Sequence, residues 1–142
     1  MPQDYLLRMI EQVAQMLAEI LRLRKIGRIS DAAEQIKAAC GRVVGLPFDV
    51  VKRSAPETIL QLLESGGGTR HVRAVMLAEL LLQDAELSDS IGKEREAAIG
   101  RAQALVLLAH SINSLSPDEQ KIYRPKLDAL NTQMTDTSSH QP

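Results

Sequence analysis

Two stretches of this sequence, 65 residues apart, share one spacing of small residues. The first begins at Gly27 and the second at Gly92, and in each an alanine follows after five positions and another after seven more. The four alanines are Ala32, Ala39, Ala97 and Ala104. Glycine readily ends a helix in the left-handed conformation, and small side chains on one face of a helix let a second helix approach closely. The pattern therefore predicts two helical hairpins.

This spacing resembles the second half of a tetratricopeptide repeat, in which a glycine and small residues occupy such places. The resemblance implies antiparallel helical hairpins rather than a regular array. The repeat period in that family is about 34 residues, whereas here a segment from Gly45 to Gly68 separates the two copies. The aromatic residue expected in the turn is Ile29 in the first copy and Glu94 in the second.

A second resemblance covers the first half of the chain. The opening from Asp4 to Gln12, DYLLRMIEQ, together with the hairpin LRKIGRISDAAEQI, is similar to a small family of uncharacterised bacterial proteins. It implies a bacterial source and helical hairpins, and it brings no activity with it.

Composition also favours helices. Only Tyr5, Phe48 and Tyr123 are aromatic, and the hydrophobic fraction of 44% comes mainly from leucine, alanine and other aliphatic residues. A chain of 142 residues fits one domain. We therefore expect an all-α fold of about six to seven helices, tetratricopeptide-like hairpins with a short-helix insert between them, in a single domain over 1–134 and a polar tail over 135–142.

The helix signals divide the chain. They predict helices over about 4–26, 30–44, 55–63, 70–90 and 93–113, and a last helix that starts after Ser116 and kinks or restarts at Pro125. Ser30 is expected to cap the second helix. The pattern of serine and, three residues later, glutamate predicts capping boxes at Ser54 and Ser116. On the helix near 93–113, the predicted inward residues are Ile99, Ala102, Leu105, Val106, Leu108, Ala109 and Ile112.

The first helix carries an apolar stripe wider than one neighbouring helix would cover. One track of this stripe is a candidate partner or dimer face, made by Tyr5, Met9, Val13, Met16 and Leu23. Closed two-fold dimers are the commonest oligomers, so homodimerisation is one form that such a contact can take.

A basic run ends the same helix. Its candidate anion contacts are Arg22, Arg24, Lys25 and Arg28, with Arg70 as a further candidate at a later helix start. We favour the simpler interpretation that these cations offset the dipole at a helix C-terminus. The near absence of aromatic residues leaves little for stacking on bases, so nucleic acid is disfavoured as a partner.

The segment from Glu64 to His71, ESGGGTRH, raises the question of a phosphate-binding loop. Such loops follow a strand, and here the preceding residues have helical character. We interpret the glycines as a turn between two helices, with Gly66 ending the first helix and Thr69 capping the second.

No catalytic, metal-binding or cofactor-binding residues are predicted. His71, His110 and His140 are scattered without metal-ligand spacing, and His110 is interpreted as a satisfied core residue. Cys40, the single cysteine, is expected to be buried as a small hydrophobe, which favours a reducing cytoplasm.

The sequence thus predicts a non-enzymatic, cytoplasmic scaffold or adaptor that binds a protein partner, a second copy of itself included. One alternative is anion or nucleic-acid binding through the residues from Arg22 to Arg28. Another is a hydrolase whose site is assembled only in space. No membrane segment is expected, because the richest apolar run, Ala102 to Ala109, is far shorter than the roughly 20 residues of a membrane span.

Overall fold

A computed structural model describes the backbone of residues 2–139 and the side chains of residues 8–65 and 67–132. Within these ranges there are seven α-helices and no strand, which confirms the all-α prediction. The helices are α1 (Pro2–Lys25), α2 (Ile29–Ala39), α3 (Phe48–Arg53), α4 (Pro56–Leu63), α5 (Arg70–Ser90), α6 (Glu94–Ser111) and α7 (Pro117–Ser139). Three short segments have other helical geometries. The π-helix is η1 (Cys40–Val44), and the 3-10 helices are η2 (Glu64–Thr69) and η3 (Ile112–Ser114).

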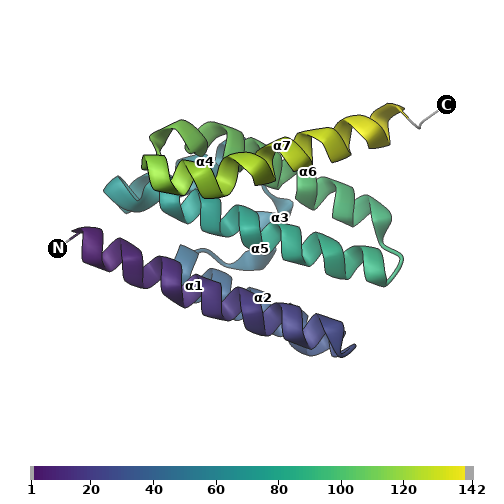
Figure 1. Cartoon of the computed structure of the whole chain (residues 1–142). Helices are drawn as coiled ribbons and strands as arrows, with labels where there is room; N and C mark the ends of the chain where they lie inside the picture. The colour runs from purple at the N-terminus through teal and green to yellow at the C-terminus, as the bar shows by residue number, and fades with distance from the viewer. Residues whose placement is uncertain (1, 140–142) are drawn as a thin grey trace.

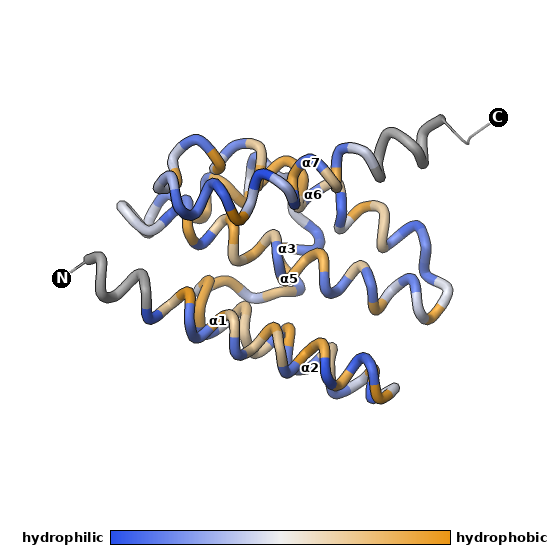
Figure 2. Tube along the Cα trace, viewed as in Figure 1, coloured by the Kyte–Doolittle hydropathy of each residue, from blue (hydrophilic) through white to orange (hydrophobic). Residues whose placement is uncertain are grey.

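Helix α5 runs through the middle of the fold, between α1 and α2 on one side and α6 and α7 on the other (Figure 1). Apolar residues recur along α1, α2 and α5 (Figure 2), and α5 turns buried side chains toward both sides. Its Leu77, Leu80 and Leu81 are fully buried and meet the buried residues of α1, α2 and α6 in one core. The almost all-round apolar surface predicted for this helix is therefore what makes it central.

The two hairpin turns have the same geometry. Gly27 and Gly92 both adopt a left-handed φ of 80°. Around Gly27, the amide of Arg28 donates to the carbonyl of Leu23 at 2.9 Å. Around Gly92, the amide of Lys93 donates to the carbonyl of Ser88 at 2.8 Å. This is the six-residue closure that commonly ends a helix at glycine, so the predicted echo is confirmed at the level of the turns.

The alanines that follow each glycine are buried as the spacing requires. Ala32, Ala97 and Ala104 are 0% exposed and Ala39 is 3% exposed. They lie in α2 and α6, and the pairs α1–α2 and α5–α6 make the most extensive helix contacts of the fold. The wider arrangement of a tetratricopeptide repeat stays a prediction.

The predicted caps are only partly correct. At Ser116, the Glu119 carboxylate accepts the Ser116 amide at 3.1 Å, and the Ser116 hydroxyl accepts the Glu119 amide at 3.3 Å, so this capping box forms. At Ser54 the capping box is wrong, because the hydroxyl donates to the Val50 carbonyl at 2.6 Å and α4 begins after Ala55. The Ser30 cap is also wrong, since α2 already begins at Ile29.

The glycine triplet is a turn between two helices, as predicted. It lies in η2, between α4 and α5. Gly67 has a positive φ of 59°. The expected role of Gly66 falls outside the described residues.

The last two helices correct three details. On α6, Ile99, Val106 and Ala109 are exposed instead of inward, and Gly100 and Gln103 occupy part of the buried face. Helix α7 does not restart at Pro125, which lies inside it. The helix extends to Ser139, past the expected start of the polar tail at residue 135, while residues 140–142 fall outside the described part.

Among the described helices, none has both the length and the apolar content needed to cross a bilayer.

Candidate functional site: an apolar groove between α1, α5 and α7

An apolar groove lies over α5, with α1 and α7 as its walls. It has a volume of about 250 Å³. Its aliphatic and aromatic lining comes from all three helices and from the loop before α7: Ile10, Val13, Ala14, Leu17, Val72, Val75, Met76, Leu115, Ile122 and Tyr123. We call this the α1–α5–α7 groove.

The wide stripe of α1 explains the α1 wall. One track, with Met9, Val13 and Leu23, is 4 to 6% exposed and packs into the core. The next track, with Ile10 and Leu17, is only half-buried and faces the groove. Thus α1 uses one side of its stripe to fold and leaves the other side accessible.

This placement corrects the predicted partner face. Met9 and Leu23 are core residues of the single chain, Met16 is half-buried against the same core, and Val13 is buried at the base of the groove that it also lines. The side chain of Tyr5 lies outside the described residues. The accessible apolar surface is one helical track away, and the exposed Ala14 at its edge gave no hydrophobic signal in the sequence.

Charged groups gather at the α5–α7 side of the groove. Lys126 forms an ion pair with Glu79, and its ammonium lies 5.2 Å from the centroid of the Tyr123 ring. Burial, together with the neighbouring carboxylates of Glu79 and Glu119, raises the pKa of Tyr123 to about 12. The Tyr123 hydroxyl therefore stays protonated at neutral pH and can donate a hydrogen bond in the groove.

Main-chain groups contribute little to this groove. Except for Leu115, every lining residue belongs to a helix. Inside a helix the backbone amides and carbonyls bond to one another. An occupant of the groove therefore meets hydrocarbon, one phenol and a few charges.

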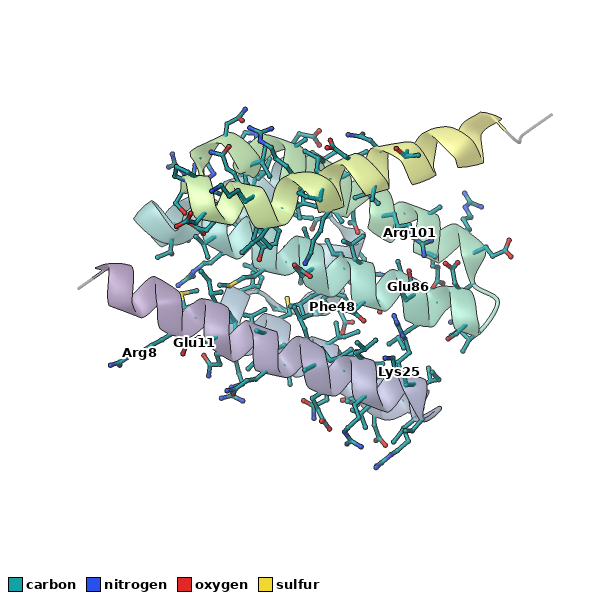
Figure 3. The ribbon with its side chains drawn as sticks, viewed as in Figure 1. Arg8, Glu11, Lys25, Phe48, Glu86 and Arg101 are labelled. Carbon is teal, nitrogen blue, oxygen red and sulfur yellow. The ribbon has the colours of Figure 1, made fainter. Side chains whose placement is uncertain are left out.

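The predicted basic patch does not form one binding surface. Arg22 pairs with Glu19 at 2.7 Å, and Arg28 pairs with Asp31 at 2.6 Å. Arg24 donates to the side chain of Gln83 at 3.3 Å. Figure 3 shows Lys25 at the C-terminal end of α1, where its charge complements the helix dipole.

Arg70 lies apart from this group. It begins α5, whereas Gln83, the contact of Arg24, lies 13 residues further along the same helix. That separation is about 20 Å along the axis. The structure therefore does not bring Arg70 to the residues from Arg22 to Arg28.

A larger pocket between α2, α3, α5 and α6 is less selective. Its volume is about 620 Å³, and seven charged side chains line it: Lys37, Asp49, Lys52, Arg53, Asp84, Lys93 and Glu96. Lys52 and Asp84 are paired at 2.5 Å. Because charges of both signs alternate around its wall, this pocket favours no particular class of ligand.

The histidines are closer than their sequence positions suggested. His71 is in the first turn of α5 and His110 in the last turn of α6, and their ring centroids are 6.3 Å apart. The core interpretation of His110 is wrong, because this residue is exposed. The signal that could have joined them is the predicted hairpin itself, which places the start of one helix beside the end of the next.

Ser111 lies next to His110 in sequence. In the part of the chain that the structure describes, no three His, Cys, Asp or Glu residues are arranged to hold a metal ion. The buried hydroxyl of Ser111 has no hydrogen-bond partner among the described residues, and neither histidine is bonded to it. Cys40 is buried as expected; its thiol donates to the Leu46 carbonyl at 3.1 Å, and burial raises its pKa to about 12.

Comparison with known proteins adds no relative. No protein-family model, no curated protein and no solved structure matches this chain.

Proposed function

We propose that this chain is a non-enzymatic helical adaptor whose α1–α5–α7 groove binds an amphipathic helix of a partner protein. The observation that carries the proposal is the groove itself, a channel of about 250 Å³ with an almost wholly apolar lining from three helices. Channels of this kind between helices are a recurrent way to bind a helical segment.

The nature of the lining selects a helix as the occupant. An extended peptide would bring unpaired amides and carbonyls against hydrocarbon, and unpaired buried backbone groups are costly. A helix satisfies its own backbone and presents only side chains. A partner helix with aliphatic residues at positions i, i+4 and i+7 fits such a groove.

The charges at the rim refine the partner. Glu79 is neutralised by Lys126, whereas Glu119 is held at the start of α7 by the Ser116 amide. A lysine or arginine beside the apolar stripe of the partner would meet the Glu119 carboxylate. Ile122, which is 57% exposed on the same wall, adds apolar contact area at the rim.

The proposed setting is the cytoplasm, since the fold buries its single cysteine as a thiol and needs no disulfide. The proposed packing of the two hairpins is tetratricopeptide-like, supported by the matching glycine turns and the buried alanines.

The test uses Ala14, an exposed residue at the edge of the groove. The Ala14→Trp variant fills the groove from the α1 wall without altering the core. Ala38→Trp is its matched control, because Ala38 is exposed on α2 and does not line the groove. The probe is a fluorescein-labelled 18-residue peptide with leucines at i, i+4, i+7 and i+11 and lysines beside them.

Fluorescence anisotropy should show saturable binding to the wild-type chain and to Ala38→Trp, and at least tenfold weaker binding to Ala14→Trp. A peptide of the same composition with two central prolines should not bind, because it cannot form the helix. Equal affinity of the two tryptophan variants, or equal binding of the proline peptide, would overturn the proposal. Sedimentation without peptide tests whether a second copy of the chain occupies the groove. In that case the wild-type chain forms a dimer and Ala14→Trp abolishes it.

A further inference from the structure

A second, smaller pocket lies where the start of α5 meets the end of α6. Its volume is about 130 Å³, the space of roughly four water molecules in the liquid. Its polar lining consists of Glu64, Arg70, His71, His110 and Ser111. Such a space suits a compact ligand and excludes a peptide.

Nitrogen-bearing side chains from two helices line this pocket. Arg70 donates from Nε to the Nε2 atom of His71 at 3.3 Å, and the His110 ring lies 6.3 Å from the His71 ring between centroids. The first amides of α5 lie at the same end, where a 21-residue helix presents the positive end of its dipole. Arginine, two imidazoles and a helix start are a set of groups that favours an anion.

The Ser111 hydroxyl supplies an independent observation. Ser111 is 0% exposed and lines the pocket, and its Oγ has no hydrogen-bond partner within the described ranges 8–65 and 67–132. Buried hydroxyls are nearly always paired, so an unpaired one calls for an explanation. An oxygen atom of a bound anion would accept its proton.

We propose that this pocket binds a compact oxyanion, a sulfate or phosphate group, between Arg70, His71, His110 and the hydroxyl of Ser111. The site is separate from the α1–α5–α7 groove and does not depend on a helical partner. Glu64 of η2 is the opposing charge, and the residues of α4 that line the pocket, Leu60 and Leu63, carry none.

Occupancy of the site should depend on pH through His71. Burial lowers the pKa of His71, and Arg70 and His110 lower it further. An anion between these groups favours the charged imidazolium, so binding should raise the pKa of His71 and weaken as pH rises. Sulfate stays a dianion from pH 5 to 8, so its pH dependence reports on the protein alone.

The experiment is a titration of the full chain at pH 6 and constant ionic strength, followed through the histidine Cε1–H signals by NMR. Sulfate and inorganic phosphate should shift the signals of His71 and His110 with one saturation curve. Arg70→Gln should weaken sulfate binding about tenfold or more, because a charge-assisted hydrogen bond is lost. Its matched control, Arg95→Gln, removes an exposed arginine at the far end of α6 and should leave the affinity unchanged.

Two further variants separate recognition from folding. Glu64→Gln should tighten sulfate binding severalfold by removing the opposing charge. Ser111→Ala should leave the melting temperature of the anion-free chain unchanged or higher, and should lose most of the stabilisation by sulfate. A parallel titration with phenyl phosphate distinguishes two sources of the anion. If the site takes a phosphoryl group carried by a larger molecule, phenyl phosphate should bind as inorganic phosphate does. If the site takes only a free anion, phenyl phosphate should not bind.

The proposal fails if sodium chloride shifts the signals as sulfate does, if Arg70→Gln binds as Arg95→Gln does, or if sulfate affinity is the same at pH 6 and pH 8.

Discussion

Met9 lies one helical track away from the proposed binding groove, and it is 6% exposed in the core. At the scale of single residues, two neighbouring faces of α1 therefore differ. The side chains of one face pack into the core, and those of the other are accessible to a partner. Ala14 and Ile122 belong to the second kind, since both line the groove and both are exposed.

Met9→Glu should therefore unfold the chain instead of separating a dimer. Burying an unpaired carboxylate among aliphatic side chains should lower the free energy of unfolding by about 3 kcal/mol or more. Urea unfolding followed by circular dichroism measures the loss, with Gln15→Glu at an exposed site of α1 as control. A stable, folded Met9→Glu monomer would contradict the placement of this residue.

Cys40 should make the free energy of unfolding depend on pH in the alkaline range. Its pKa is raised to about 12 in the folded chain from an ordinary value of 9.0, so above pH 9 the unfolded state loses the thiol proton first. The free energy of unfolding should then fall as pH rises from about 9 toward 12, by up to about 1.4 kcal/mol per pH unit from this group.

Cys40→Ala should show a shallower decline over pH 9 to 11 in urea unfolding, although it starts from a lower stability because a buried side chain is shortened. An equal slope in the two proteins would mean that the thiol is not protected from solvent. Tyr123, whose pKa is also raised to about 12, contributes a decline above pH 10 that both proteins share.

At the scale of elements, two turns and one clamp hold the hairpins in place. Gly27 and Gly92 close the turns in the left-handed conformation. The buried Gln103 of α6 reaches the end of α3 and the linker that follows it. Its Nε2 donates to the carbonyls of Val51 at 3.1 Å and Ser54 at 3.0 Å. Facing helices are also tied at the surface, where Arg101 of α6 approaches Glu86 of α5 (Figure 3) at 3.4 Å.

Gly92→Ala should destabilise the chain by about 1 kcal/mol, and Gly27→Ala should do the same, because alanine is strained at a φ of 80°. An added Cβ at either position meets no described atom within 4 Å, so the cost is conformational. Gly41→Ala is the matched control: its φ is not left-handed and its surroundings are open. It should be neutral or stabilising in thermal melts, and a reversed order of the variants would contradict the turn geometry.

Gln103→Met should cost about 1 kcal/mol, since it keeps the volume and removes the side-chain donor to the Ser54 carbonyl, whereas the Val51 carbonyl still accepts the Ser54 amide. The exposed Gln35→Met on α2 is the control and should change stability by less than about 0.5 kcal/mol. Chemical denaturation measures both. A neutral Gln103→Met would contradict a stabilising role for this hydrogen bond.

These elements also show what sequence could predict. Glycine at a helix end acts locally, so both hairpin turns were predictable. A capping box depends on where the helix begins: Ser116 forms one, whereas Ser54 follows α3 so closely that its hydroxyl bonds back to Val50. Amphipathic periodicity gave the width of the α1 stripe but not which track its neighbours cover, because one of those neighbours, α5, comes from a distant part of the sequence.

At the scale of the whole molecule, α5 is shared. It supplies the floor of the α1–α5–α7 groove in its first half, and its first turn supplies Arg70 and His71 to the smaller polar pocket. The histidine pair could not be predicted from spacing, since it exists only because α5 and α6 lie side by side. The groove and the pocket are therefore two separate sites on one helix.

The most direct test of the helix-binding groove is a map of where the 18-residue leucine peptide lies. Intermolecular nuclear Overhauser effects between its leucine methyls and a chain with labelled methionine methyls, tyrosine rings and phenylalanine ring give that map. The account predicts contacts to the Met76 methyl and the Tyr123 ring, both of which line the groove. Contacts to the Phe48 side of the molecule, with none to Met76 or Tyr123, would contradict it.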